Sequence, residues 1–192
     1  MPDLVLASTS PYRGALLEQL GVPFRRRAPG VDEDALKLGA SGPRELAERL
    51  ALAKALSLRD EEPAATLIGS DQLVAFEGRI FGKPGTAARA SDQLAAMAGR
   101  AHALITALAV WHDNRTYPHT DVTTLHMRSL DREAIARYVA ADLPLDCAGS
   151  YKLERRGITL FERIESEDHT AITGLPLIAL TTILREIGYV IP

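Results

Sequence analysis

Apolar residues recur with two different periods along the chain, and this indicates that strands and helices alternate. An apolar run at 4–7 and the largely apolar stretches at 66–76 and 101–111 predict strands. Leucines and alanines at helical spacing follow Pro11 and Pro43 and predict helices that begin there. The interleaved order favours the α/β fold class.

Capping residues set the expected ends of these helices. Ser10 stands before a proline and is a good N-cap for a first helix, which should stop at Gly21. A second helix is expected from Pro43 to about Ser57. Thr86 should cap a third, alanine-rich helix. A strand that feeds through a polar turn into a helix N-terminus is a geometry suited to binding anions.

Two turns should reverse the direction of the chain. The strand 66–76 returns through the turn 77–79 to a short partner, and the strand 101–111 returns through 113–115 to a strand at 117–127. Hairpins add antiparallel pairs to a fold that otherwise alternates strands and helices. We therefore expect a mixed central sheet flanked by helices.

The last third of the chain continues the alternation. A helix with Ile135 on its buried face should stop before Pro144, and residues 158–161 read as a strand. A closing helix is expected from about Pro176 to Glu186. No repeat or linker interrupts the pattern, so we expect a single domain.

Composition narrows the class of protein. The 192 residues are 46% hydrophobic, which fits one globular domain over residues 1–192. The formal net charge of -3 gives no basic surface for nucleic acid or an anionic membrane. No window approaches the roughly 20 apolar residues of a membrane span, and no targeting pattern is visible, so a cytoplasmic location is expected. Cys147, the single cysteine, excludes an internal disulfide.

Several common catalytic motifs are missing. The chain has no G-x-G-x-x-G, H-E-x-x-H or G-x-S-x-G, and residues 78–83 do not have the spacing of a P-loop. The histidines are scattered, and we interpret four of them as surface or structural residues: His102, His112, His119 and His126.

Polar residues gather where predicted strands end or elements turn. They are Ser8, Ser10, Arg13, Asp32, Glu33, Lys54, Asp71, Gln72, Lys83, Lys152 and Glu154. Cleavage of a phosphoanhydride needs cations to hold charged phosphates, and carboxylates to bind a divalent metal or to activate water. This set supplies both kinds of group.

Three of these residues stand in unusual places. Asp71 lies in an apolar strand, where an unpaired carboxylate costs several kcal/mol, so it should be paired, bound to metal or exposed at a cleft. Lys54 lies beside a buried helical face, either for function or with its stem across apolar surface and its charge in water. Arg13, one turn into a helix, opposes the helix dipole; a bound anion or simple solvation would each explain it.

The order of the polar blocks resembles the Maf family. The opening Leu4-Val5-Leu6-Ala7-Ser8-Thr9-Ser10-Pro11-Tyr12-Arg13 is similar to the first family motif. The later blocks are Val31-Asp32-Glu33, Ala53-Lys54-Ala55, Gly69-Ser70-Asp71-Gln72, Gly82-Lys83-Pro84, Ala148-Gly149-Ser150-Tyr151-Lys152-Leu153-Glu154 and Thr173-Gly174-Leu175-Pro176. The resemblance covers nearly the whole chain.

The resemblance implies a nucleoside triphosphate pyrophosphatase with two lobes about a central cleft, similar in shape to the inosine triphosphate pyrophosphatases. It also implies a divalent cation, Mg²⁺ or Mn²⁺, at Glu33 and Asp71. Asp71 matches the family's proton acceptor, while Ser8, Arg13, Glu33, Lys54 and Lys83 match residues that bind phosphates, metal or attacking water. Gly14 departs from the pattern, since many relatives have a basic residue there.

The resemblance also bears on the substrate. The dTTP and UTP pyrophosphatases of the family tend to carry arginine, threonine and glutamine where this chain has Tyr12, Gln72 and Glu154. The chain is more similar to the YceF-type subfamily, whose substrate is 7-methyl-GTP. Methylated guanine is cationic, which suits an aromatic face at Tyr12 and a carboxylate at Glu154.

Two alternatives stay open beside hydrolysis of 7-methyl-GTP. One is a dTTP and UTP pyrophosphatase, and the other is a nucleotide-binding regulatory module linked to septum formation. An intact Asp71 surrounded by cations favours catalysis. The expected partner is a small nucleoside triphosphate, and the sequence leaves open whether the protein forms a homodimer.

Overall fold

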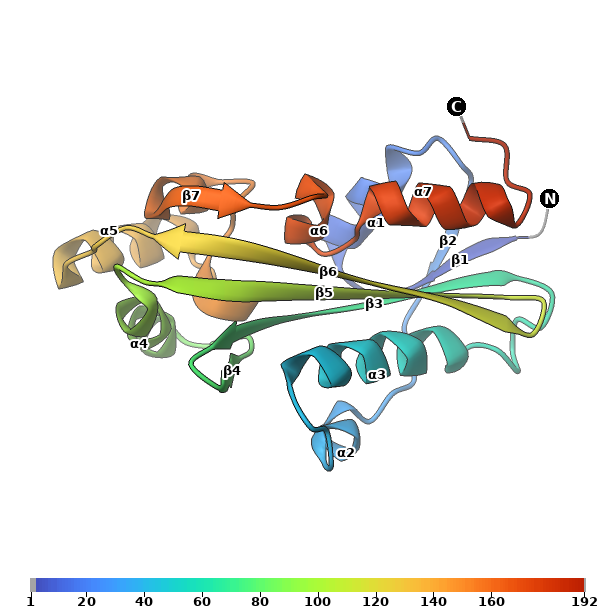
Figure 1. Cartoon of the computed structure of the whole chain (residues 1–192), viewed down its shortest axis with the longest axis horizontal. Helices are drawn as coiled ribbons and strands as arrows, with labels where there is room; N and C mark the ends of the chain where they lie inside the picture. Colours follow the sequence, from blue (N-terminus) through green and yellow to red (C-terminus); the bar gives the residue numbers. More distant parts are fainter. Residues whose placement is uncertain (1–2, 192) are drawn as a thin grey trace. The chain divides into compact units, whose positions relative to one another are not determined.

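The computed structural model describes residues 3–191 (Figure 1). The strands are β1 (Leu4–Ala7), β2 (Arg25–Arg27), β3 (Thr66–Phe76), β4 (Arg79–Phe81), β5 (Ala101–His112), β6 (Arg115–Met127) and β7 (Phe161–Glu165). The α-helices are α1 (Pro11–Glu18), α2 (Glu33–Lys37), α3 (Pro43–Leu56), α4 (Ala87–Met97), α5 (Arg132–Asp142), α6 (His169–Thr173) and α7 (Leu177–Glu186), and the 3-10 helices are η1 (Ala148–Ser150) and η2 (Arg156–Leu160).

The chain folds into two compact units. The first comprises the chain up to Asp71, the segment Thr106–Asp121 and the chain from Asp168 on. The second comprises Gln72–Ile105 and Val122–Glu167. The chain passes from one unit to the other within the strands β3, β5 and β6 and once more between β7 and α6, so neither unit is a continuous piece of sequence.

The first unit is built on parallel strands in the order β2-β1-β3, followed by its parts of β5 and β6. Within the ladder, Val5 pairs with Arg25 on one side and with Leu67 on the other. All four residues of β1 are buried, as expected for a strand covered on both faces. In the second unit β4 pairs with β3, and β7 with β6, in antiparallel fashion. The mixed α/β sheet expected from the sequence is confirmed.

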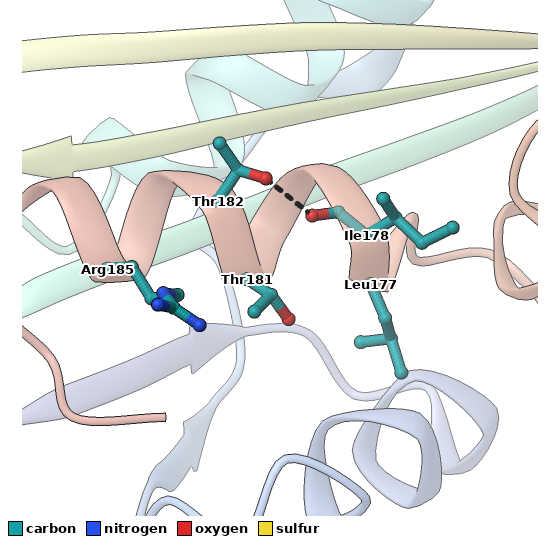
Figure 2. A pocket seen from close by; sticks show the side chains of 5 residues that line it. All are labelled: Leu177, Ile178, Thr181, Thr182 and Arg185. Atoms are coloured by element: carbon teal, nitrogen blue, oxygen red, sulfur yellow. Dashed lines mark hydrogen bonds between the residues drawn. The ribbon is translucent and has the colours of Figure 1, made fainter. Parts of the chain in front are cut away.

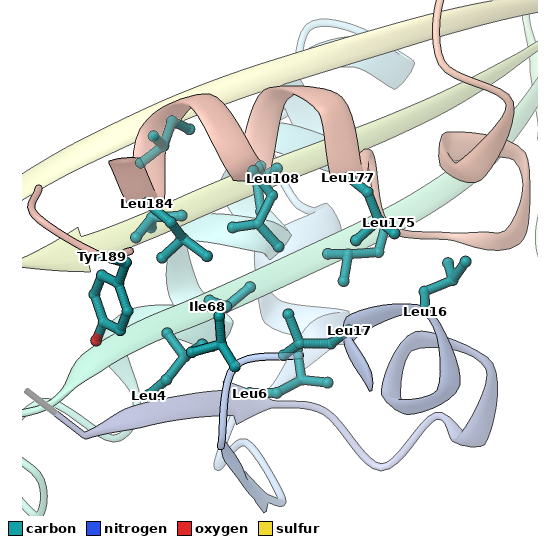
Figure 3. Packing of buried hydrophobic residues seen from close by; sticks show 14 of the residues in the cluster. Leu4, Leu6, Leu16, Leu17, Ile68, Leu108, Leu175, Leu177, Leu184 and Tyr189 are labelled. Carbon is teal, nitrogen blue, oxygen red and sulfur yellow. The ribbon is translucent and has the colours of Figure 1, made fainter. Parts of the chain in front are cut away.

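The core of the first unit joins the start of the chain to its last helix. Figure 3 shows Leu6, Leu17 and Ile68 packed with residues that come from the C-terminal part of the chain, among them Leu175 and Leu184. These five side chains are fully buried, which is worth about 1.5 to 3 kcal/mol for each leucine or isoleucine.

Gly69 allows α3 to approach β3 closely. A Cβ atom at this position would lie 2.1 Å from the carbonyl oxygen of Ala51 and 2.5 Å from the backbone nitrogen of Ala55. Only a residue without a side chain fits there. The helix predicted from Pro43 is confirmed, and the close contact places Lys54 against the strand that carries Asp71.

The hairpin predicted at residues 77–79 is confirmed, with positive φ angles at Glu77 and Gly78. The strand predicted at 158–161 is wrong, because residues 156–160 form the 3-10 helix η2 and the strand begins at Phe161. Gly157 donates a hydrogen bond to the carbonyl of Lys152 at 3.0 Å, so the chain curls over Lys152 before it enters the sheet.

Three short elements were not expected from the sequence. β2 consists of three arginines, and α2 and α6 have five residues each, too few to show a helical period. Among the described residues, no helix is long and apolar enough to cross a membrane.

Candidate functional site

The turn after β1 is organised by two serines of the first unit. The buried hydroxyl of Ser8 accepts a hydrogen bond from the backbone of Ser10 at 3.1 Å. The hydroxyl of Ser10 accepts one from the backbone nitrogen of Arg13 at 3.4 Å, which caps α1 as predicted. Pro11 occupies the first helical turn, where its missing N–H costs no hydrogen bond.

Arg13 is held by the loop that follows α6. Its Nε donates to the carbonyl oxygen of Gly174 at 2.8 Å, and the hydroxyl of Ser70 donates to the same oxygen at 2.9 Å. Burial lowers the pKa of the Arg13 guanidinium, whereas the charges of Asp71 and Glu33 raise it. The guanidinium stays charged, so the arginine belongs to one electrostatic group with these carboxylates.

Lys54 stands between two carboxylates of the same unit. Its Nζ lies 2.6 Å from Oδ1 of Asp71 and 2.8 Å from Oε1 of Glu33. The side chains of Lys54 and Asp71 are only 9% and 10% exposed, while that of Glu33 is 50% exposed. A buried ammonium needs such partners, so the charge of Lys54 is paired with carboxylates rather than left in water, and its role in function stays a prediction.

The same two carboxylates fit a divalent cation. Oxygens of Glu33 and Asp71 both contact the Lys54 ammonium, so the two carboxylates face one small region where a cation can sit. Mg²⁺ is commonly held by one or two carboxylates together with substrate phosphates and water. Residues 3–191 contain no group of three or more His, Cys, Asp or Glu suited to a metal, so substrate oxygens and water would complete the shell.

The second unit carries a separate cationic group at Lys152. Its Nζ lies 2.9 Å from Oδ1 of Asp146, and its backbone nitrogen donates to the hydroxyl of Tyr138 at 2.9 Å. Burial raises the pKa of Asp146, but the hydrogen bond and charge of Lys152, together with hydrogen bonds from the backbone and from Cys147, hold that pKa below its usual value. The Lys152 side chain is only 9% exposed, so burial and the ion pair with Asp146 hold its ammonium in one place.

The other predicted site residues differ in burial. Lys83 and Glu154 are exposed, and Tyr12 and Gln72 are half-buried. The structure thus brings Arg13, Glu33, Lys54 and Asp71 into one charged group, while the roles of the remaining residues stay predictions. Asp32 accepts hydrogen bonds from the backbone of residues 34 and 35 at 3.1 Å and caps α2, which is a structural role.

Sequence reasoning missed several residues that support these groups. Ser70 and Gly174 lie inside sequence blocks noted above, and that position was the available signal; in the structure the carbonyl oxygen of Gly174 accepts from both Ser70 and Arg13. Asp146 and Gln93 lie outside every block, and nothing in their spacing marks them.

Among the histidines, His102 is a buried residue of the second unit. Its Nε2 lies 3.0 Å from the hydroxyl of Tyr151, and its ring packs on Tyr151 and Phe161. Nδ1 has no hydrogen-bond partner among the described residues. Burial, and to a smaller extent the charge of His126, lower the pKa of His102 to about 4, so the ring is neutral at pH 7.

A hollow of about 530 Å³ lies along α7, and none of the predicted site residues lines it (Figure 2). It is lined by Leu177, Ile178, Thr181, Thr182 and Arg185. The hydroxyl of Thr182 already donates to the carbonyl of Ile178 at 3.0 Å within the helix. This hollow contains no carboxylate or other group that could activate water.

Comparison with known proteins agrees with the polar blocks. The family model described as "Maf-like protein" matches residues 3–187. A 7-methyl-GTP pyrophosphatase of Bdellovibrio bacteriovorus is 51% identical over 184 residues, which cover 96% of this chain and 96% of that protein. Proteins of the same name from Xanthomonas axonopodis and Pseudomonas aeruginosa are 47% and 44% identical, with complete coverage of both chains.

A solved structure supports the fold. The structure of a HAM1 protein from Coxiella burnetii superposes with a TM-score of 0.50 and covers 97% of this chain and 100% of that chain. Because the sequences are 16% identical, this likeness concerns the fold alone.

Proposed function

This chain belongs to the Maf family, and from that membership we propose that it hydrolyses 7-methyl-GTP to 7-methyl-GMP and pyrophosphate. Support for the substrate comes from relatives that are 41% to 51% identical and are named 7-methyl-GTP pyrophosphatase. The observation that carries the reaction is the buried Lys54 ammonium held between Asp71 and Glu33.

Asp71 is the group we assign to proton transfer. In the proposed reaction the oxygen of a water molecule attacks the α-phosphorus, and the bond from that phosphorus to the bridging oxygen of the pyrophosphate breaks. The Asp71 carboxylate accepts the proton that the attacking water loses. Its contact with Lys54 fixes the orientation of the carboxylate, which a general base requires.

The cations are assigned to the phosphates. Arg13 and the turn with Ser8 and Ser10 present a guanidinium and a capped helix N-terminus, both of which favour anions. Lys54 and Lys83 would stabilise charge on the departing pyrophosphate. Lys152 is assigned to nucleotide binding as well, which the resemblance of its sequence block supports.

A divalent cation, Mg²⁺ or Mn²⁺, is part of the proposal. Glu33 and Asp71 are the residues that would hold it, and the ion would neutralise charge on the phosphates when bound. A negatively charged triphosphate near two carboxylates needs such a counter-charge beyond what Lys54 supplies.

Three residues are assigned to the choice of base. Methylation of guanine at position 7 makes the ring cationic, and a cation gains about 0.5 to 2 kcal/mol over an aromatic face such as Tyr12. Glu154 adds an opposite charge, and the amide of Gln72 can donate and accept hydrogen bonds. A neutral pyrimidine would gain less from these groups.

The test is pyrophosphate release from 7-methyl-GTP, GTP, UTP and dTTP by the purified protein with Mg²⁺. We expect the highest kcat/KM for 7-methyl-GTP, and we expect its margin over GTP to shrink in Tyr12→Ala and Glu154→Gln. A lead by UTP or dTTP would instead assign the alternative pyrimidine specificity. Tight binding of all four nucleotides without turnover would assign a regulatory binding module.

Such a substrate places the work of the protein in the cytoplasm, where nucleoside triphosphates are made. The net charge of -3 gives no support to a nucleic-acid partner. Gel filtration and light scattering at several concentrations would decide between a monomer and a homodimer.

A further inference from the structure

Gln93, on α4 in the second unit, connects two sequence blocks that carry proposed substrate residues. Its side-chain Nε2 donates to the carbonyl oxygen of Gly82 at 3.2 Å, and its Oε1 accepts from the hydroxyl of Ser150 at 2.5 Å. Gly82 immediately precedes Lys83, and Ser150 stands two residues before Lys152. One amide therefore binds both blocks.

The orientation of this amide follows from its partners. A backbone carbonyl can only accept a hydrogen bond, so the NH₂ group must face Gly82. That leaves the amide oxygen for the hydroxyl of Ser150, which is fully buried. To make both hydrogen bonds, a side chain needs a donor and an acceptor close together. The amide group of Gln93 has both.

The turn at Ser150 needs support. Ser150 has a φ of +65°, a conformation that few residues other than glycine adopt, and it follows Gly149 with a φ of +73°. A Cβ at Gly149 would lie 2.7 Å from Cγ2 of Val74, so the turn is also tightly enclosed. The hydrogen bond from Ser150 to Gln93 helps to hold this backbone, and Lys152 follows two residues after Ser150.

The segment around Lys83 is tied at both ends. Besides the bond from Gln93 to Gly82, the backbone nitrogen of Gly85 donates to the carbonyl of Leu145 at 3.0 Å. The exposed Lys83 thus lies between two attachments. Gly82 is connected to Ser150 through Gln93, and Gly85 is bonded to Leu145, five residues before Ser150.

We infer that Gln93 is a positioning residue that fixes Lys83 relative to Lys152 for nucleotide binding. Gln93 acts through its neighbours and does not itself contact the substrate. This inference rests on the proposed function, because the roles of both lysines are part of that proposal. All the contacts that carry it lie within the second unit.

The first experiment compares steady-state kinetics of 7-methyl-GTP hydrolysis in Gln93→Leu, Ser150→Ala and wild type. Leucine keeps most of the volume of glutamine and removes both hydrogen bonds. We expect KM to rise on the order of tenfold in Gln93→Leu, as the loss of two hydrogen bonds implies, with a smaller rise in Ser150→Ala and little change in kcat. Gln19→Leu makes the same chemical change at an exposed position and should leave KM unchanged.

A double-mutant cycle with Lys83→Ala then tests whether Gln93 acts through Lys83. Two residues that act independently multiply their effects on kcat/KM, whereas coupled residues do not. We expect Gln93→Leu to have a much smaller effect when Lys83 is already alanine. Hydrogen exchange should also become faster in residues 82–85 and 149–152 of Gln93→Leu.

Two outcomes overturn the inference. In one, Gln93→Leu lowers the melting temperature but leaves KM and kcat of the folded enzyme unchanged, which is a purely structural role. In the other, the effects of Gln93→Leu and Lys83→Ala simply multiply. If the wild type releases no pyrophosphate, the proposed function fails by itself, and calorimetric titration with 7-methyl-GTP replaces kinetics. Equal affinities of wild type and Gln93→Leu, or no binding, would then overturn the positioning role.

Discussion

Asp71 is the residue whose substitution tests the proposed reaction most directly. Asp71→Asn keeps the size of the side chain and an oxygen that can accept from Lys54, but the amide cannot take a proton from water. We expect kcat to fall by roughly 100-fold or more, as the loss of a general base typically costs. Stopped assays of pyrophosphate release would measure it, with the melting temperature as a control for folding. A near-normal rate in folded Asp71→Asn would exclude the role.

His102 should make stability depend on pH. Its pKa is about 4 in the folded protein against 6.5 in the unfolded chain, so folding favours the neutral ring. The stabilisation is complete above pH 6.5 and is lost as the pH falls toward 4, on the order of 3 kcal/mol in all. Urea unfolding at a series of pH values measures this effect. In His102→Gln, which cannot titrate, the free energy of unfolding should no longer fall between pH 6.5 and 4, whereas in His119→Gln, at an exposed position, the fall should remain. An unchanged slope in His102→Gln would assign the pH dependence to other groups.

At the level of residues, the sequence predicted the charged groups but not their contacts. Asp71 was marked by a carboxylate in an apolar strand, and its partner Lys54 by a cation beside a buried helical face. The carbonyl of Gly174, which holds Arg13, is distant in sequence and carries no side chain. A contact made by a backbone atom leaves no trace in residue type, and only the folded chain shows it.

Gly69 tests the fit between two elements. In Gly69→Ala the added methyl would meet the backbone of α3 at Ala51 and Ala55, so the helix must shift away from β3. We expect a loss of stability of about 1 to 3 kcal/mol in urea unfolding, and a fall in kcat because Lys54 moves from Asp71. Gly30→Ala is the matched control, because a Cβ there has no atom within 4 Å. Wild-type stability and activity in Gly69→Ala would show that α3 can move away from β3 without cost, and would contradict the prediction.

Element prediction succeeded where a period or a cap was present. The strand at 66–76 and the helices beginning near Pro43 and Thr86 follow directly from such signals. β2 was not predicted, because a run of three arginines is typical of a solvated segment. In the structure Arg25 and Arg27 pair with Glu62, which is distant in sequence. The strand expected at 158–161 failed because close approach of Gly157 to Lys152 overrides the local apolar pattern.

At the scale of the whole molecule, the proposed reaction depends on a divalent cation. In the proposed reaction a triphosphate meets Glu33 and Asp71, and two carboxylates and a polyanion need more positive charge than Lys54 and Arg13 provide. We expect excess chelator to abolish pyrophosphate release and Mg²⁺ or Mn²⁺ to restore it. The measurement is the rate against free metal concentration, and Glu33→Gln should need more metal for half-maximal rate. Full activity in chelator would contradict the proposal.

The two compact units are not two domains that follow one another along the sequence. Each is assembled from separate stretches of chain, and three of the four changes from one to the other occur inside strands rather than in connecting segments. Sequence patterns could not reveal this division, because a linker is the only boundary that composition marks. We retain the proposal of one domain over the whole chain.

The core that joins Leu6 and Ile68 to Leu175 and Leu184 has a consequence for biosynthesis. While the protein is being translated, the apolar faces of β1 and α1 lack the cover that α7 supplies until the residues of that helix have left the ribosome. Such contacts between distant parts of a chain form slowly. The first unit therefore completes its folding only after the residues of α7 have left the ribosome, and until then its earliest residues present an apolar surface that chaperones can bind.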